Sequence, residues 1–142
     1  MRLESAFLAQ AATVLPDGRF FVFGGGIDGF VGAELPIIVP SVSAVARIHF
    51  SPEDCGVEHE LLATFAGPPE SEPGFNAGRK FKPVLSPYLP DRGTILPFVV
   101  DITNLRLTHE GLYTVSYSAG DTLLGKLTYV AYLARARERE GE

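Results

Sequence analysis

The residue pattern with the clearest chemical meaning is a glycine run at residues 24–29, whose sequence is GGGIDG. It matches the glycine spacing of dinucleotide-binding turns, in which the glycines let the backbone approach a pyrophosphate. Such a turn must open a helix, because the helix N-terminus holds the phosphates. Residues 30–36 instead lead into another β-rich segment. We therefore predict a glycine-permitted bulge or a crossing between sheets, and no nucleotide cofactor.

Two histidine–glutamate pairs, His59-Glu60 and His109-Glu110, begin like the zinc-protease motif HExxH. Neither pair is followed by the second histidine at the required spacing, and neither lies in helical surroundings. His59 shares the apolar side of its strand with residues such as Leu61, so we expect a partly buried histidine near a strand end. The sequence predicts no metal site.

Nucleophilic catalysis has no specific support in the sequence. The chain has no GxSxG motif, and its only cysteine, Cys55, lies in a turn-forming segment at residues 51–56. A single cysteine also excludes an intramolecular disulfide and a cage of several cysteines around a metal. We predict no catalytic residues and no cofactor, and the sequence favours a protein that is not an enzyme.

The one basic cluster of the chain is Arg79-Lys80-Phe81-Lys82, and aromatic residues are interleaved with it. Such a mixture is typical of surfaces that bind an acidic partner or stack on a ligand. The alternative is a solvated edge strand whose lysines prevent pairing with another chain. The candidate binding residues are Phe75, Arg79, Lys80, Phe81, Lys82 and Tyr88.

The elements that must position these side chains are strands. Apolar residues alternate with polar ones, while 11 prolines and 15 glycines interrupt the chain too often for long helices. We predict an all-β fold, a two-sheet antiparallel sandwich of immunoglobulin-like or jelly-roll-like type with about seven or eight strands. The expected strands cover residues 3–14, 19–23, 42–50, 57–65, 94–105, 112–118 and 123–133.

Turn residues connect these strands. The sequences PDG at residues 16–18 and AGD at residues 119–121 each predict a hairpin. Residues 109–113, HEGLY, resemble the tyrosine corner of β-sandwiches, in which a phenol bonds back to the chain. Six of the 11 prolines fall within residues 67–93, which we expect to form a long crossover containing an edge segment.

Length and charge bound the class of protein. With 142 residues, the chain is predicted to form one domain over residues 1–134 and a charged C-terminal tail over residues 135–142. The net charge of −5 argues against nucleic acid as a ligand. No apolar run reaches the roughly 18 residues of a membrane span, and no signal-peptide core is present, so we expect a cytoplasmic protein without membrane contact.

Several segments together resemble a known family. They are residues 4–12 (ESAFLAQAA), residues 17–19 (DGR) leading through Phe23 to the triple glycine, and Asn104-Leu105 with residues 111–113 (GLY). In these features the chain resembles a family of small bacterial β-sandwich proteins of unknown function. The resemblance implies a bacterial origin and an all-β fold, and it assigns no catalytic residues.

Three hypotheses for function follow. The first is a non-enzymatic binding or protein-interaction module with an unidentified protein partner, which would use residues 67–93 or, second, residues 24–32. The second is a small-molecule or carbohydrate binder, or a hydrolase, with a pocket between the sheets. A pocket containing His49 or His59 beside an acid would favour the enzyme, whereas a flat apolar patch would favour a protein partner. The third is a self-assembling subunit that forms homo-oligomers through an edge strand.

Overall fold

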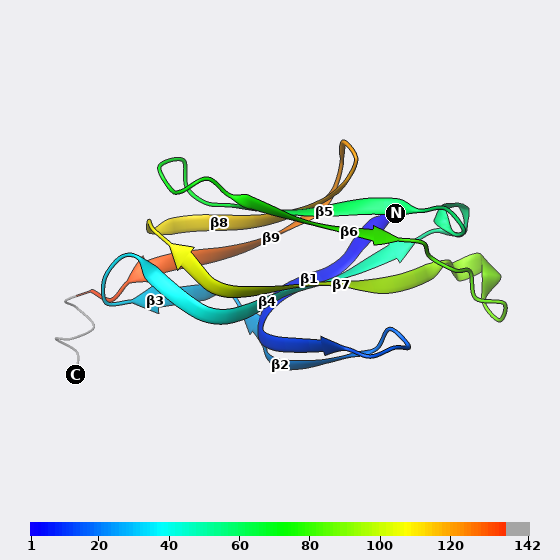
Figure 1. Cartoon of the computed structure of the whole chain (residues 1–142), viewed down its shortest axis with the longest axis horizontal. Coiled ribbons are helices and arrows are strands. Elements are labelled where there is room, and N and C mark those ends of the chain that lie inside the picture. The colour runs from blue at the N-terminus through cyan, green and yellow to red at the C-terminus, as the bar shows by residue number, and fades with distance from the viewer. Residues whose placement is uncertain (136–142) are drawn as a thin grey trace.

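The computed structural model describes residues 1–135 and is built almost entirely from β-strands (Figure 1). The prediction of a charged tail at residues 135–142 concerns a segment that, apart from Arg135, lies outside the described residues. Within the described part, two single-turn 3-10 helices, η1 (Pro52–Asp54) and η2 (Pro90–Arg92), accompany nine strands. The strands are β1 (Arg2–Val14), β2 (Phe20–Ile27), β3 (Gly29–Gly32), β4 (Ile37–Phe50), β5 (His59–Ala66), β6 (Phe75–Phe81), β7 (Thr94–Leu107), β8 (Gly111–Ala119) and β9 (Thr122–Leu133).

The strands form two sheets, in the orders β2-β1-β4-β7 and β3-β9-β8-β5-β6. This arrangement confirms the predicted all-β sandwich of two sheets. The strand count exceeds the expectation because β6 proves to be a full strand and because β3 was not predicted. β3 has only four residues, two of them glycine, and it pairs parallel to β9, whereas the other paired strands are antiparallel.

The core lies between the sheets and is built from one face of each. In β4, the even-numbered residues from Val42 to Phe50 are buried, as the alternation of that segment predicted. Near the centre, the ring of Phe98 lies 5.6 Å from that of Phe81 and 5.8 Å from that of Tyr117, measured between centroids. Full burial of one large apolar side chain stabilises the fold by roughly 1.5–3 kcal/mol. These contacts hold the edge strand β6 against the opposite sheet.

The hairpin of β1 and β2 bends away from its sheet and lies under its outer face (Figure 1). Its tip, residues 18–20, lines a shallow depression together with residues of β4 and β7. Ser43 and Val45 lie on the face of β4 that points away from the core. They are buried because the hairpin covers this face. On the opposite face of the hairpin, the side chain of Phe21 is 59% exposed and that of Phe23 is 63% exposed.

The triple glycine forms a bulge and then a crossing between sheets, as predicted. Gly24 and Gly26 have φ angles of 57° and 86°, which residues with a side chain rarely adopt. The register between β1 and β2 shifts at this point, between Leu8 and Ala9. The chain then leaves the sheet of β2 and enters the other sheet as β3, with no helix after the glycines.

The two predicted hairpins and the tyrosine corner are also present. β1 pairs with β2 across residues 16–18, and β8 pairs with β9 across residues 119–121. The hydroxyl of Tyr113 donates a hydrogen bond to the carbonyl oxygen of His109 at 2.8 Å and accepts one from its backbone N–H at 3.3 Å. The corner fixes the path of the chain from β7 into β8.

Candidate ligand-binding site

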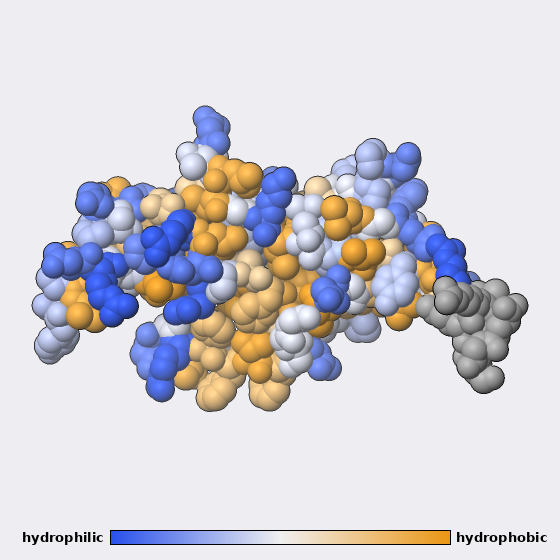
Figure 2. Space-filling view, turned by 180° about the vertical axis from the view of Figure 1, so that it is seen from behind, coloured by the Kyte–Doolittle hydropathy of each residue, from blue (hydrophilic) through white to orange (hydrophobic). Residues whose placement is uncertain are grey.

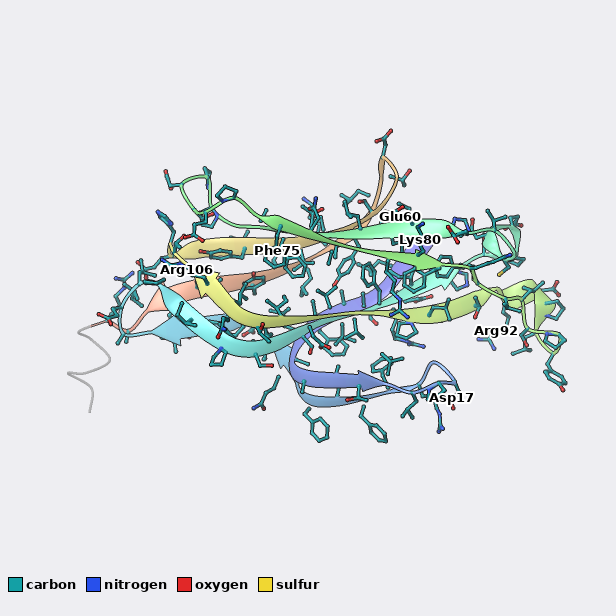
Figure 3. The ribbon with its side chains drawn as sticks, in the orientation of Figure 1. Asp17, Glu60, Phe75, Lys80, Arg92 and Arg106 are labelled. Carbon is teal, nitrogen blue, oxygen red and sulfur yellow. The ribbon has the colours of Figure 1, made fainter. Side chains whose placement is uncertain are left out.

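A pocket of about 340 Å³ opens between the two sheets, where β6 begins and β7 ends. Its volume lies in the range of small-molecule sites, which start at about 300 Å³. Figure 3 shows Phe75 of β6 and Arg106 of β7 at this end of the sandwich. The pocket is lined mainly by β5, the loop at residues 67–74, the end of β7 and one residue each from β8 and β9. The lining residues of most interest are Phe65, Glu72, Phe75, Asn104, Arg106 and Tyr129.

Two stacked pairs of aromatic rings form part of the pocket wall. Phe65 and Phe75 are directly opposite in β5 and β6, and their rings stack at 4.5 Å with an angle of 9°. Tyr113 and Tyr129 are opposite in β8 and β9 and stack at 5.4 Å with an angle of 17°. Cross-strand neighbours on one face of a sheet approach closely enough for such stacking. Phe75 is 43% exposed, so its ring is available to a ligand.

Asn104 lies in the wall of the pocket in an unusual backbone conformation. Its φ angle is 53°, and it is the only residue other than glycine with positive φ among those described. It stands in β7 opposite Pro40 of β4, at a position that is not paired although the register is the same on both sides. Proline has no N–H for the ladder, and asparagine tolerates the left-handed region better than most residues. Strain of this kind gathers at binding sites, and here it leaves an amide beside the pocket.

The loop at residues 67–74 is attached to β7 at the mouth of the pocket. The Glu72 carboxylate lies 3.3 Å from Nε of Arg106, and the Glu72 backbone N–H donates to the hydroxyl of Thr108 at 3.5 Å. Within the loop, the Ser71 hydroxyl donates to the carbonyl oxygen of Pro68. These contacts hold the mouth in place before a ligand arrives, which lowers the entropic cost of binding.

The electrostatics of the pocket are close to neutral. Arg106 is the one lysine or arginine in the lining and Glu72 the one acid, and the two are paired. Burial, with a smaller effect from Tyr113, raises the pKa of Tyr129 to about 12. The phenol of Tyr129, which is only 2% exposed, is uncharged at neutral pH and adds no charge to the pocket.

The six residues predicted to bind a partner do not form one surface. Only Phe75 lines the pocket, and the strand separates it from Phe81 by about 20 Å. Phe81 is buried in the core, and the Arg79 guanidinium lies over its ring at 5.1 Å. Lys80, whose ammonium lies 3.9 Å from the Glu58 carboxylate, is labelled in Figure 3 near Glu60. The remaining two are Lys82, beside a separate shallow depression, and Tyr88, which is 90% exposed.

His49 and His59 lie away from the pocket, whereas Nδ1 of His109 is 2.9 Å from the hydroxyl of Thr108, which lines it. Nε2 of His49 is 2.8 Å from the carbonyl oxygen of Arg92, and Nε2 of His59 is 2.7 Å from that of Asp54, so each of these nitrogens donates. His59 is partly buried at the start of β5, as expected. Neither His49 nor His59 lines the pocket. Within residues 1–135, no group of three or more histidine, cysteine, aspartate or glutamate residues is placed to hold a metal ion.

Sequence reasoning missed Glu72, Asn104, Arg106 and Tyr129 as site residues. The proline-rich segment at residues 67–93 pointed to the loop that carries Glu72, and the alternation in residues 123–133 put Tyr129 on an apolar face. No local signal connected them, because they come from segments far apart in the chain. The positive φ of Asn104 has no sequence marker beyond the tolerance of asparagine for that region.

The fold and the pocket together define an all-β sandwich protein with a ligand-sized opening between its sheets. A comparison with protein families matches residues 4–131 to DUF6941, a family of unknown function, and the chain belongs to this family. The match confirms that the chain is related to a family of unknown function, while the bacterial origin stays a prediction. No curated protein matches the chain. Among the described residues, no helix has the length and apolar character that crossing a membrane requires.

Proposed function

We propose that this chain is a non-enzymatic binding module that takes a small ligand between its two sheets. The observation that carries the proposal is the pocket of about 340 Å³, with its two stacked aromatic pairs and its prearranged mouth. Apolar walls with a few placed polar groups are typical of sites that bind small molecules. The lining contains neither histidine nor cysteine, which favours binding over acid–base or thiol chemistry.

The test uses NMR titration of the ¹⁵N-labelled chain with a set of small neutral aromatic compounds. We expect chemical-shift changes to concentrate at residues 65–75 and 102–108. Phe75→Ala removes a stacking surface and is expected to weaken binding about tenfold, since an aromatic contact with its buried area is worth roughly 1–2 kcal/mol. Phe21→Ala is the matched control, because it removes an exposed ring that does not line the pocket. Equal affinities for both variants would contradict the proposal.

A second candidate function, association with a protein, is favoured by the exposed face of the β1–β2 hairpin. Phe21 and Phe23 lie there on β2, an edge strand with no charged residue between Phe20 and Ile27. Figure 2 shows apolar side chains gathered over this hairpin. Flat exposed patches of this kind are typical of protein interfaces, and an unpaired edge can add a strand from another chain.

Light scattering of the purified chain distinguishes association with a second copy of the chain from association with a different protein. A dimer that Phe23→Lys converts to a monomer would support self-assembly through β2. A monomer that captures another protein only when Phe23 is intact would support a different partner. Retention of every interaction in Phe23→Lys would exclude the hairpin as an interface. Tyr88→Lys is the matched control, because it replaces another exposed aromatic residue, in the loop before β7, with the same charged side chain.

A further inference from the structure

The charge at the mouth of the pocket depends on one pair of residues. Arg106 is the one cation in the lining, and its Nε faces the carboxylate of Glu72 at 3.3 Å. Arg106 extends from β7, whereas Glu72 lies on the loop before β6, so the pair bridges the two sheets. Figure 3 shows Arg106 near the start of β6, where Phe75 is labelled.

Hydrogen bonds anchor the backbone at Glu72 and at the residue before it. The Glu72 N–H donates to the hydroxyl of Thr108, and the preceding residue, Ser71, is held by two hydrogen bonds to the carbonyl oxygen of Pro68. The backbone N–H of Ser71 lies 2.9 Å from that oxygen. The carboxylate is thus kept beside Arg106 although both side chains are more than half exposed.

An arginine at the mouth of an apolar pocket attracts carboxylates, because its planar guanidinium matches the two carboxylate oxygens. Glu72 already occupies the Nε side of this guanidinium and adds a negative charge of its own. A ligand carboxylate must displace Glu72 or lie beside it, and both are unfavourable. A neutral ligand neither has to displace Glu72 nor places a second negative charge beside it.

Building on the binding function proposed above, we infer that the pocket selects neutral, ring-bearing ligands over carboxylates and that Glu72 is the residue that sets this selectivity. The ligand ring lies against Phe75, the aromatic side chain of the lining that is substantially exposed, at 43%. A hydroxyl or amide on the ligand is matched by the uncharged polar groups of the lining, Thr103 and Asn104. The ligand class is therefore that of phenols, aromatic alcohols and aromatic amides.

The experiment compares two probes of similar shape, 4-ethylphenol and 4-ethylbenzoate, by NMR titration against the whole chain. We expect the unmodified protein to bind the phenol about fivefold more tightly than the benzoate, which corresponds to the effect of one surface charge. Glu72→Gln frees the guanidinium and is expected to raise benzoate affinity about fivefold with phenol affinity unchanged. Glu70→Gln, in the same loop but outside the pocket lining, should leave both affinities unchanged.

The possible outcomes test the selectivity, the role of Glu72 and the binding function separately. If benzoate binds the unmodified protein as tightly as the phenol, the selectivity is wrong. If Glu72→Gln leaves the ratio of affinities unchanged while its circular dichroism spectrum is native, Glu72 does not set it. Arg106→Gln provides a second check, because it should weaken benzoate binding and leave phenol binding intact. If neither probe binds the unmodified protein, the proposed binding function itself fails.

Discussion

The pocket end of the sandwich and the β1–β2 hairpin both bring aromatic rings to the surface, but their surroundings differ. At the pocket end, Glu72 is ion-paired to β7 and Glu110 accepts a hydrogen bond from β9, while Tyr113 bonds back to His109 within its own corner. In the hairpin, Phe21 and Phe23 project into solvent. In the part of the hairpin where β1 and β2 pair, residues 8–27, the hydrogen bonds found outside the strand pairing lie in the turn at residues 15–19.

The difference shows how a sandwich can form two kinds of surface. Where segments from both sheets converge, polar bonds between them can hold a concave site of fixed shape. Where one hairpin leaves the sheet, its outer face has no second layer to cover it and stays flat. A concave site with fixed walls suits a small ligand, whereas a flat apolar face suits another protein. If the two regions differ in rigidity in this way, substitutions at the pocket end should cost more stability than substitutions in the hairpin.

The largest expected effect is that of Gly74→Ala, directly before β6. A Cβ at this position would lie 1.8 Å from the carbonyl oxygen of Phe65, which is backbone and cannot move alone. We expect a loss of about 3 kcal/mol or more in the free energy of unfolding, measured with urea. Gly78→Ala, within β6, is the control, because its nearest neighbour is 3.5 Å away. Equal stability of the two variants would mean that the pocket end is not rigid.

Two tyrosines of β8 test whether polar bonds hold the pocket end together. Tyr113→Phe removes the hydroxyl that bonds to His109 at 2.8 Å and should cost about 1–2 kcal/mol. Tyr117→Phe removes a hydroxyl that is buried without a partner, so stability should stay constant or rise by up to about 1 kcal/mol. Thermal unfolding of the two variants measures the contrast. A reversed order would show that the tyrosine corner adds no stability.

A pH titration tests the same end through Glu110. The backbone N–H of Leu133 and the side chain of Arg135 donate to its carboxylate and hold the pKa of Glu110 below its usual value. Because the folded pKa is the lower one, this contribution is present above about pH 4.3, the unfolded value, and is lost as the pH falls through the folded pKa. Glu110→Gln should therefore lower Tm at neutral pH and match the unmodified protein in acid. A difference in Tm that is independent of pH would contradict this.

The smallest effect on stability is expected in the hairpin. Phe23→Thr retains a residue suited to strands and removes a ring that is mostly solvated, so the free energy of unfolding should change by no more than about 0.5 kcal/mol. Urea denaturation measures it at several protein concentrations. A loss that grows with concentration would show that the ring is buried in an oligomer, and a large loss at every concentration would show that the hairpin is packed more tightly than its exposure indicates.

Much of the fold could be predicted because the signals are local. Alternation of apolar residues and turn residues identified the positions of seven strands, and glycine and proline marked both hairpin turns; the seven are β1, β2, β4, β5, β7, β8 and β9. The edge segment β6 was expected within the crossover, but its extent was not, because its outward face carries Asn76, Gly78 and Lys80 and gives little apolar signal. The bend that places the β1–β2 hairpin under its own sheet depends on twist and on packing, which no alternation records.

The sequence by itself determined which residues alternate between core and solvent, where the chain turns and where glycine permits a bulge, because these properties depend on a few neighbouring residues. Only the tertiary structure decided that Glu72, Phe75, Asn104, Arg106 and Tyr129 surround one pocket. Their meeting requires β6 and β7, which follow one another in the chain, to lie at the edges of opposite sheets. The physical reason is that a strand's face is set by its own side-chain period, whereas its neighbours are set by the packing of the whole core.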